Sequence, residues 1–200
     1  MLKSEDSYKD DLLSVIDDKI SELQVKIIES RQEFLKEIQN SINGFKTSLN
    51  EIYDFKIVYQ CSFDKIDKES ILKKYKENLD KDKEKMITSL GVHKDDFKIY
   101  INANDASNFG SQGEQRFIIL LVKLALVELI KNKIKDYPIL VLDDVFSELD
   151  ENRKKEVYEI IKKIDQVFIT GCNVKDIKEI QNINKYEIKE RKIEKIEGEK

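Results

Sequence analysis

The chain has 200 residues, of which 38% are charged and 40% are hydrophobic. The apolar share is large enough for a folded core, and the length suits one domain, or one domain with a small second piece. Its 6 glycines and single proline argue against a sandwich or barrel of many short strands and favour long helices. Because the formal net charge is −4, any DNA binding would depend on a local basic face.

The chain carries no sign of export or of a membrane segment. Its two cysteines, Cys61 and Cys172, lie far apart and form no CxxC pattern, so a zinc site or a disulfide framework is poorly supported. The first residues mix lysines with acidic side chains and lack the apolar core of a signal peptide. The most apolar window, residues 117–130, is too short to span a bilayer. We therefore expect a cytoplasmic protein.

Residues 1–90 predict a helical arm of two long amphipathic helices with a short strand-like segment, residues 55–59, between them. Near-heptad spacing in the first helix allows coiled-coil-like packing, and Asn43-Gly44 can break or kink it. The two helices could pair antiparallel as an arm or pack on a globular body, and the pattern does not decide between these. The apolar positions are Ile16, Ile20, Leu23, Ile27, Phe34, Ile38, Ile42, Phe45, Leu49 and Ile52 in the first helix, and Ile71, Leu72, Tyr75, Leu79, Met86, Ile87 and Leu90 in the second.

Residues 91–200 predict an α/β unit with a parallel sheet. Helix, buried strand, helix and buried strand follow one another, which is typical of parallel sheets flanked by helices. From Lys185 the tail alternates isoleucine with charges and is expected to form an edge strand. The expected elements before that tail are a strand at 97–101, a polar loop at 102–110, helix 112–133, strand 139–142, helix 151–164 and strand 167–170.

The strongest local signal is the apolar run 139–142, which is followed directly by Asp143 and Asp144. The run predicts a strand in the middle of the sheet, and α/β sheets place their ligands at the carboxyl ends of such strands. One carboxylate can hold Mg²⁺ through water, and its neighbour can orient or deprotonate an attacking water. The alternative is a strand that simply ends in an acidic turn.

A second polar motif, Ser111-Gln112-Gly113-Glu114-Gln115-Arg116, opens the apolar helix. Ser111 is a good N-cap, Gly113 allows a phosphate to approach the backbone closely, and the free N–H groups of a helix start favour an anion. Taken alone, this motif is equally an ordinary helix cap. Together with Asp143-Asp144 and the following Ser147-Glu148-Leu149-Asp150, in this order, it is far more specific.

These motifs resemble those of ABC-type ATPases. Residues 111–116 resemble the signature motif, residues 139–144 the Walker B strand and residues 147–150 the D-loop. The wording FGSQGEQR…YPILVLDDVFSELD is similar to the RecF family, bacterial DNA replication and repair ATPases related to SMC and Rad50 proteins. Residues 91–96 resemble a GPHRDD segment of that family, with Val92 in place of proline. The resemblance covers the C-terminal half of such a protein and is strongest from Gly91 to Thr170.

The resemblance implies a role for each matching residue. Asp143 would bind the Mg²⁺ of MgATP, and Asp144 would take the place of the catalytic carboxylate, which ABC enzymes usually supply as Glu. The signature would contact the γ-phosphate of ATP held by the opposite subunit, and the D-loop would cross the dimer interface to couple the two sites. The nucleotide-contacting residues implied in this way are Ser111, Gln112, Gly113, Glu114, Arg116, Ser147 and Asp150.

Two positions bear on this resemblance: the one where many ABC proteins have a histidine, and the single histidine of this chain. Many ABC proteins carry a γ-phosphate-sensing His after the strand that follows Walker B, whereas this chain has Thr170 there, as RecF proteins also tend to lack that His. The single histidine, His93, lies in the RecF-like segment and is expected to pack there or at a lobe interface, without a metal or base role.

An ATPase of this kind also needs a P-loop, GxxxxGK[S/T], and this sequence contains none. We expect the P-loop half to lie upstream or on another polypeptide, or to be lost, so that the chain is a truncated or split C-terminal half. Such a chain is expected to bind ATP poorly and hydrolyse it negligibly when alone. Strand 167–170 would then have an open, apolar edge.

The resemblance implies a protein of DNA replication, recombination, repair and the SOS response, which dimerises with ATP and Mg²⁺ on DNA at single/double-strand gap junctions. The implied partners are a second copy or a complementary P-loop half and recombination mediator proteins, with no membrane. Lys73, Lys74 and Lys76 are candidates for DNA contact or form a solvated helix face. The alternatives are a fragment of an SMC- or Rad50-like chromosome structural ATPase and a non-enzymatic remnant that interacts through its arm.

Overall fold

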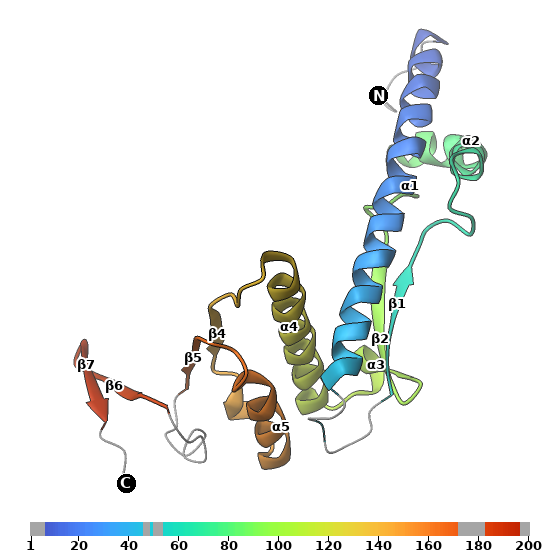
Figure 1. Ribbon diagram of the computed structural model, residues 1–200. Coiled ribbons are helices and arrows are strands. Elements are labelled where there is room, and N and C mark those ends of the chain that lie inside the picture. The colour runs from blue at the N-terminus through green and yellow to red at the C-terminus, as the bar shows by residue number, and fades with distance from the viewer. Residues whose placement is uncertain (1–6, 46–48, 50–53, 172–182, 197–200) are drawn as a thin grey trace.

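The computed structural model describes residues 7–45, 49, 54–171 and 183–196. The long helix α1 extends from the top of the view into its lower half, the other elements cross its upper part or lie to the sides of its lower half, and the β6–β7 hairpin lies farthest from it (Figure 1). In chain order the elements are α1 (Ser7–Gly44), β1 (Phe55–Gln60), α2 (Lys68–Lys85), β2 (Asp96–Ile101), β3 (Asn104–Asp105), α3 (Ala106–Phe109), α4 (Gln112–Ile134), β4 (Leu140–Asp143), the 3-10 helix η2 (Phe146–Glu148), α5 (Glu151–Ile161), β5 (Val167–Thr170), β6 (Lys185–Lys189) and β7 (Lys192–Ile196).

The ends of the two predicted arm helices follow from local backbone chemistry. Helix α1 ends at Gly44, where the sequence predicted a break, and Phe45 continues it in a 3-10 turn. Leu49 lies outside the helix, but both Phe45 and Leu49 are buried in the main cluster, as expected for apolar positions; Ile52 lies outside the described residues. The Asp67 carboxylate caps α2 by accepting a hydrogen bond from the Ser70 amide. Helix α2 ends at Lys85 rather than near residue 90, because Met86 takes the left-handed conformation that closes many helices.

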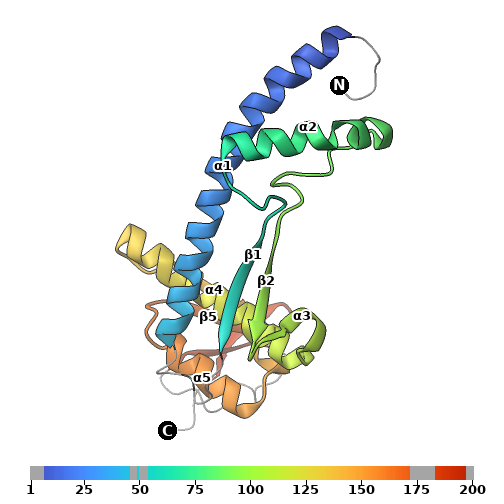
Figure 2. The ribbon, with the colours of Figure 1, turned by 90° about the vertical axis from the view of Figure 1, so that its right-hand side faces the viewer.

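The packing of α1 differs from the predicted apolar face before Ile38, whereas Ile38 and Ile42 of that face are buried. Ile20, Leu23, Ile27 and Phe34 are each between 39% and 45% exposed. The buried side chains on this part of α1 are instead Ser21, Gln24 and Ile28. Helix α2 crosses α1 rather than pairing antiparallel alongside it (Figure 2). The contact is made by a small cluster in which Ile28 packs with Phe63, Ile71 and Tyr75.

The lower half of α1 packs against the rest of the chain. Strands β1 and β2 pair antiparallel from Phe55↔Ile101 to Gln60↔Asp96, and β3 continues the sheet after a two-residue turn. Ile38 and Ile42 of α1 share one hydrophobic cluster with Ile101 and with α4. The proposed parts 1–90 and 91–200 therefore share one sheet and one cluster. The predicted loop 102–110 also contains β3 and α3, which the sequence did not predict.

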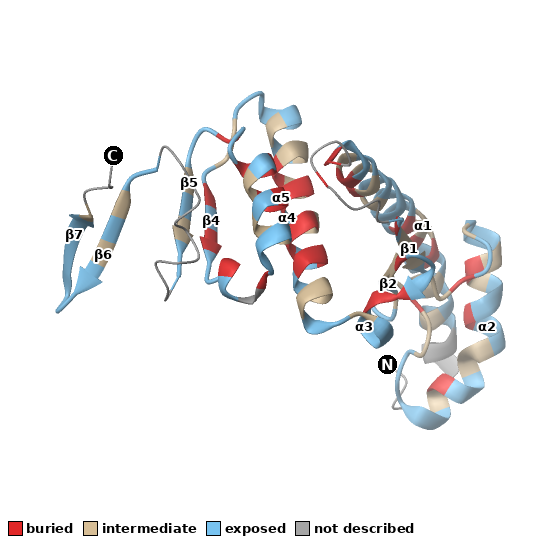
Figure 3. Ribbon diagram, turned by 90° about the horizontal axis from the view of Figure 1, so that it is seen from below, coloured by how far each residue is buried: buried red, intermediate tan, exposed pale blue. Residues whose placement is uncertain are grey.

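The parallel sheet of the predicted α/β unit is formed by β4 and β5, whose register runs from Leu140↔Val167 to Asp143↔Thr170. Leu140 and Leu142 are buried in the main cluster, together with residues of α4 and α5 (Figure 3). The alternate residues Ile139 and Val141 are exposed. Among the described residues, β4 and β5 pair only with each other, so β4 is not in the middle of a sheet there. The α/β class is confirmed.

The C-terminal tail forms a hairpin of its own. Strands β6 and β7 pair antiparallel from Lys185↔Ile196 to Lys189↔Lys192, so the predicted edge strand pairs within the tail instead. The two turn residues, Glu190 and Arg191, both have positive φ, as the tightest hairpin turns require. In the part of the chain that the structure describes, no helix combines the length and apolar character needed to cross a membrane.

Candidate functional site

The carboxyl ends of β4 and β5 bring three predicted residues together. Asp143 and Thr170 are register partners, and the Thr170 hydroxyl donates a hydrogen bond to the Asp143 carboxylate. The Asp144 amide donates to the Thr170 carbonyl oxygen at 3.1 Å and to its hydroxyl oxygen at 3.2 Å. The Ser147 hydroxyl donates to the Asp144 carbonyl oxygen at 3.0 Å. The start of the predicted D-loop is therefore tied to the acidic pair.

The two carboxylates at this edge are exposed and offer only oxygen donors. Asp144 has a φ of 48°, a left-handed conformation that Asp tolerates better than most residues and that is often found at functional turns. Mg²⁺ prefers oxygen ligands and is commonly held by one or two carboxylates together with substrate phosphates. No group of three or more His, Cys, Asp or Glu able to hold a metal occurs among the described residues. Two carboxylates alone suit Mg²⁺ that takes its remaining ligands from elsewhere.

The predicted signature turn is a complete capping box at the start of α4. The Glu114 amide donates to the Ser111 hydroxyl oxygen at 3.3 Å, and the Glu114 carboxylate accepts from the Ser111 amide at 2.8 Å and from its hydroxyl at 2.7 Å. These hydrogen bonds, with a smaller effect of the Arg153 charge, lower the pKa of Glu114. The remaining predicted residues lie on the first turns of α4, with Gln112 and Arg116 exposed and Gly113 half-buried.

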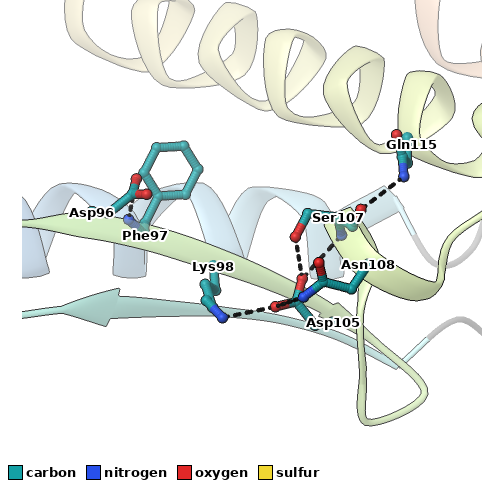
Figure 4. Close-up of polar contacts among 7 residues, drawn as sticks. All are labelled: Asp96, Phe97, Lys98, Asp105, Ser107, Asn108 and Gln115. Atoms are coloured by element: carbon teal, nitrogen blue, oxygen red, sulfur yellow. Dashed lines mark hydrogen bonds and ion pairs between the residues drawn. The ribbon is translucent and has the colours of Figure 1, made fainter.

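A polar network holds the chain that leads into this turn (Figure 4). The Asp105 carboxylate caps α3 by accepting from the Ser107 amide and hydroxyl, and it also accepts from Asn108 and from Lys98 at 2.9 Å. The Ser107 hydroxyl and the Lys98 ammonium lower the pKa of Asp105 to about 2. This nearly buried carboxylate fixes α3 against strand β2.

Two residues that the sequence analysis left without a role connect α3 to α4. The Gln115 side-chain amide donates to the carbonyl oxygens of Ala106, Ser107 and Gly110, at 3.1 to 3.2 Å. At Gly110 a Cβ atom would lie 2.6 Å from the Ala106 carbonyl oxygen, so a side chain does not fit without backbone movement. The glycine immediately before Ser111 was the available signal for this close approach.

The end of the predicted D-loop lies beside the signature turn. The Asp150 carboxylate caps α5 by accepting from the Arg153 amide at 3.0 Å. The Arg153 guanidinium lies 3.4 Å from Asp150 and 3.8 Å from Glu114. The predicted residues therefore form two groups, one at the ends of β4 and β5 and one at the starts of α4 and α5. Arg153 was missed because its only sequence signal was its place three residues after Asp150, which the resemblance assigns to the D-loop and not to a helix cap.

The chain is similar in sequence and in structure to RecF proteins. The chain is 42% identical to the DNA replication and repair protein RecF of Clostridium beijerinckii over 183 residues, which cover 88% of the chain and 49% of that relative. It is 38% identical to RecF of Streptococcus thermophilus over 178 residues. A solved structure of the recombination mediator protein RecF-ATP in the RecFOR pathway superposes with a TM-score of 0.74 and 27% identity, covering 94% of this chain and 51% of that one. The chain is similar to the C-terminal half of these RecF proteins. It spans about half the length of the curated RecF relatives it matches, and no protein-family model matches it.

The RecF-like segment 91–96 connects strand β1 and the loop that follows it to helix α1. The Asp95 carboxylate accepts from the Tyr59 hydroxyl at 2.6 Å and from the Ser62 amide and hydroxyl. Gln24 and Arg31 of α1 bind the Val92 amide and carbonyl oxygen. His93 lies with Nε2 at 3.2 Å from the Thr88 carbonyl oxygen and packs against Gly91, where a Cβ atom would approach Nδ1 to 3.0 Å. These contacts lie within the segment and at Thr88, while the His93 side chain is itself exposed.

Proposed function

We propose that this chain supplies the signature, Walker B and D-loop parts of a RecF-type ATPase that dimerises and binds DNA under the control of ATP. The observation that carries the proposal is the cluster of Asp143, Asp144 and Thr170 at the carboxyl ends of two parallel strands. α/β proteins bind their ligands at this edge. The RecF relatives and the RecF-ATP structure support a nucleotide as that ligand.

The residues of the first group have distinct tasks in this proposal. Asp143 would hold Mg²⁺, which would offset the charge of the phosphates when bound. Asp144 would accept a hydrogen bond from the attacking water and receive its proton. Thr170 keeps the Asp143 carboxylate and the Asp144 backbone in place for these tasks. The β- and γ-phosphates themselves would be cradled by a P-loop, which this sequence lacks.

The second group would act on a nucleotide bound by another subunit. When the Ser111 hydroxyl turns from Glu114 to a γ-phosphate, the free N–H groups at the start of α4 and Gly113 add favourable contacts for the anion. Ser147 and Asp150 would lie at the interface between the subunits. The partner is a second RecF-type chain or a complementary N-terminal half with the P-loop.

The wider role is a further part of this proposal, supported by the relatives' names in DNA replication and repair and by the RecFOR pathway of the matched structure. We place the assembly in the cytoplasm, at DNA gap junctions in recombinational repair and the SOS response, together with recombination mediator proteins. DNA contact would use lysines on one face, for which Lys73, Lys74 and Lys76 of α2 are candidates. The crossing of α1 by α2 favours this RecF-type role over the longer coiled coil of the SMC- or Rad50-like alternative.

The experiment mixes this chain with the P-loop half of Clostridium beijerinckii RecF and follows ATP binding, dimerisation and turnover. The chain alone should bind MgATP weakly and hydrolyse it negligibly, and the mixture should dimerise with ATP. Ser111→Arg should block dimerisation, whereas Asp144→Asn should dimerise but turn over slowly. The controls Ser14→Arg and Asp165→Asn make the same changes at exposed positions outside both groups.

Micromolar MgATP binding by the chain alone would contradict its dependence on a separate P-loop half. Normal turnover of both Ser111→Arg and Asp144→Asn in the mixture would show that the two motifs are wrongly assigned. A wild-type mixture that never responds to ATP would overturn the proposed function itself.

A further inference from the structure

One side chain, Arg153, lies between the two helix starts of the second group. Helix α4 begins at the capping box of Ser111 and Glu114, and α5 begins at its cap, Asp150. Arg153 belongs to α5 and is only 17% exposed, although its guanidinium is charged. The guanidinium lies over the ring of the buried Phe117, 5.6 Å from its centre. Phe117 is the residue of α4 that directly follows the signature motif.

The two carboxylates divide their oxygens between a local task and Arg153. Glu114 uses Oε2 for the Ser111 amide and hydroxyl, while its Oε1 lies 3.8 Å from Nη2 of Arg153. Asp150 uses Oδ1 for the cap of α5, while its Oδ2 lies 3.4 Å from Nη1 of Arg153. The two ends of one planar guanidinium thus face two carboxylates on two different elements. A single lysine ammonium could not hold both in this way.

We propose that Arg153 is a positioning residue that ties the signature turn to the D-loop, so that a phosphate bound by Ser111 also sets the position of Asp150. This inference rests on the proposed function. It extends that function to a residue outside the motifs and assigns the coupling of the signature and the D-loop to one side chain.

The chemistry of phosphate binding gives Arg153 its task. To donate to a phosphate, the Ser111 hydroxyl must give up its hydrogen bond to the Glu114 carboxylate. That carboxylate then has one donor fewer and lies close to the negative charge of the incoming phosphate. The positive charge of Arg153 offsets this repulsion and keeps Glu114 on the Ser111 amide. Because the same guanidinium also pairs with Asp150, a movement of Glu114 moves Arg153 and, with it, Asp150 of the D-loop.

The test compares Arg153→Gln and Arg153→Lys with Lys154→Gln, which removes a neighbouring charge of similar exposure that pairs with Glu151 on its own helix. In the assembly with a P-loop half, we expect Arg153→Gln to weaken ATP-dependent dimerisation about tenfold and Arg153→Lys to rescue little of it, since charge alone does not replace the fork. Lys154→Gln should stay within about twofold of wild type. Thermal melting checks that all variants fold.

A double-mutant cycle separates coupling from a general loss of structure. If Arg153 connects the two motifs, Asp150→Ala should weaken the ATP response much less in the Arg153→Gln background than in wild type. In the isolated chain, carboxyl NMR should show the pKa of Glu114 rising in Arg153→Gln but not in Lys154→Gln.

Two outcomes overturn the inference while leaving the proposed function intact. One is an ATP response that is normal in Arg153→Gln, and the other is full additivity of Arg153→Gln and Asp150→Ala. An unchanged Glu114 titration in Arg153→Gln would also contradict the link between Arg153 and the signature turn. If the wild-type assembly does not respond to ATP, the proposed function fails, and this inference fails with it.

Discussion

The hydroxyl of Thr170, the last residue of β5, donates a hydrogen bond to the carboxylate of Asp143, the last residue of β4. The same hydroxyl oxygen accepts a hydrogen bond from the Asp144 amide at 3.2 Å. One side chain therefore orients both members of the acidic pair. This contact depends on the parallel register, which places Thr170 directly beside Asp143.

Replacing Thr170 by Val keeps the shape of the side chain but removes its hydrogen bonds. We expect Thr170→Val to lower Mg²⁺-dependent turnover of the assembly by about tenfold, because Asp143 loses the donor that fixes its carboxylate. The free energy of unfolding should fall by only about 1 kcal/mol, the usual net value of a hydrogen bond. Turnover against Mg²⁺ concentration and urea unfolding measure the two effects.

Thr170→Ser is the matched variant, since it keeps the hydroxyl and should retain most of the turnover. Equal turnover of Thr170→Val and wild type would show that the hydroxyl does not position the acidic pair.

The sequence predicted the parts of this site that depend on local chemistry. A Ser with Glu three residues later is a capping box wherever a helix starts. An apolar run before Asp143 is a strand of the α/β unit, although only Leu140 and Leu142 of that run are buried. The position of Arg153 could not be predicted in the same way. Its ion pair with Asp150 is local, three residues along the chain. Its ion pair with Glu114 depends on how close the starts of α4 and α5 lie, and that is a result of packing.

Helix α1 shows the same limit. Its pattern of Ile20, Leu23 and Ile27 correctly indicated an amphipathic helix, but periodicity does not tell which neighbour a face meets. Helix α2 packs on the side that carries Ile28, and the polar Gln24 is buried there because its side chain accepts a hydrogen bond from the Val92 amide. A buried polar residue with a distant backbone partner leaves no periodic signal.

Gly110 should be intolerant of any side chain. In Gly110→Ala the new Cβ atom would lie 2.6 Å from the Ala106 carbonyl oxygen, so the backbone between α3 and α4 must shift. Overpacking of this kind costs about 1–3 kcal/mol, measurable by urea unfolding. We also expect weaker ATP-dependent dimerisation, because Ser111 is the next residue.

Gly44→Ala makes the same change at the end of α1, where no described atom beyond the two neighbouring residues and the helix backbone lies within 4 Å of the new Cβ. It should leave stability within about 1 kcal/mol of wild type or raise it, because Ala is the better helix former. If Gly110→Ala were as stable as Gly44→Ala, the close approach at Gly110 would not constrain the turn.

Asp105 should make the region before the signature turn sensitive to acid. Its pKa in the folded chain, about 2, lies below the ordinary value of 3.8, so the fold favours the charged form. The stability that it contributes is therefore complete above pH 3.8 and is lost as the pH falls toward about 2. Carboxyl NMR should show Asp105 titrating near the lower value.

The causes of this shift can be tested one at a time. Ser107→Ala should raise the pKa of Asp105 most, since the Ser107 hydroxyl has the largest effect, and Lys98→Met should raise it as well. Lys94→Met, at an exposed neighbouring position, is the control. An Asp105 pKa that does not change in Ser107→Ala would contradict the network in Figure 4.

The outer face of the β4–β5 sheet should be where a complementary half joins. Ile139 and Val141 of this face are each 63% exposed and Phe168 is 52% exposed, although strands with such runs are usually covered on both faces. Burying a Val or Phe side chain is worth about 1.5–3 kcal/mol, so we expect Phe168→Lys to weaken assembly with a P-loop half at least tenfold. The same change should reduce self-association of the chain alone, which light scattering measures.

Ile188→Lys, which alters an exposed apolar residue of β6, is the control and should leave assembly unchanged. Assembly of Phe168→Lys at wild-type affinity would show that the partner half joins elsewhere.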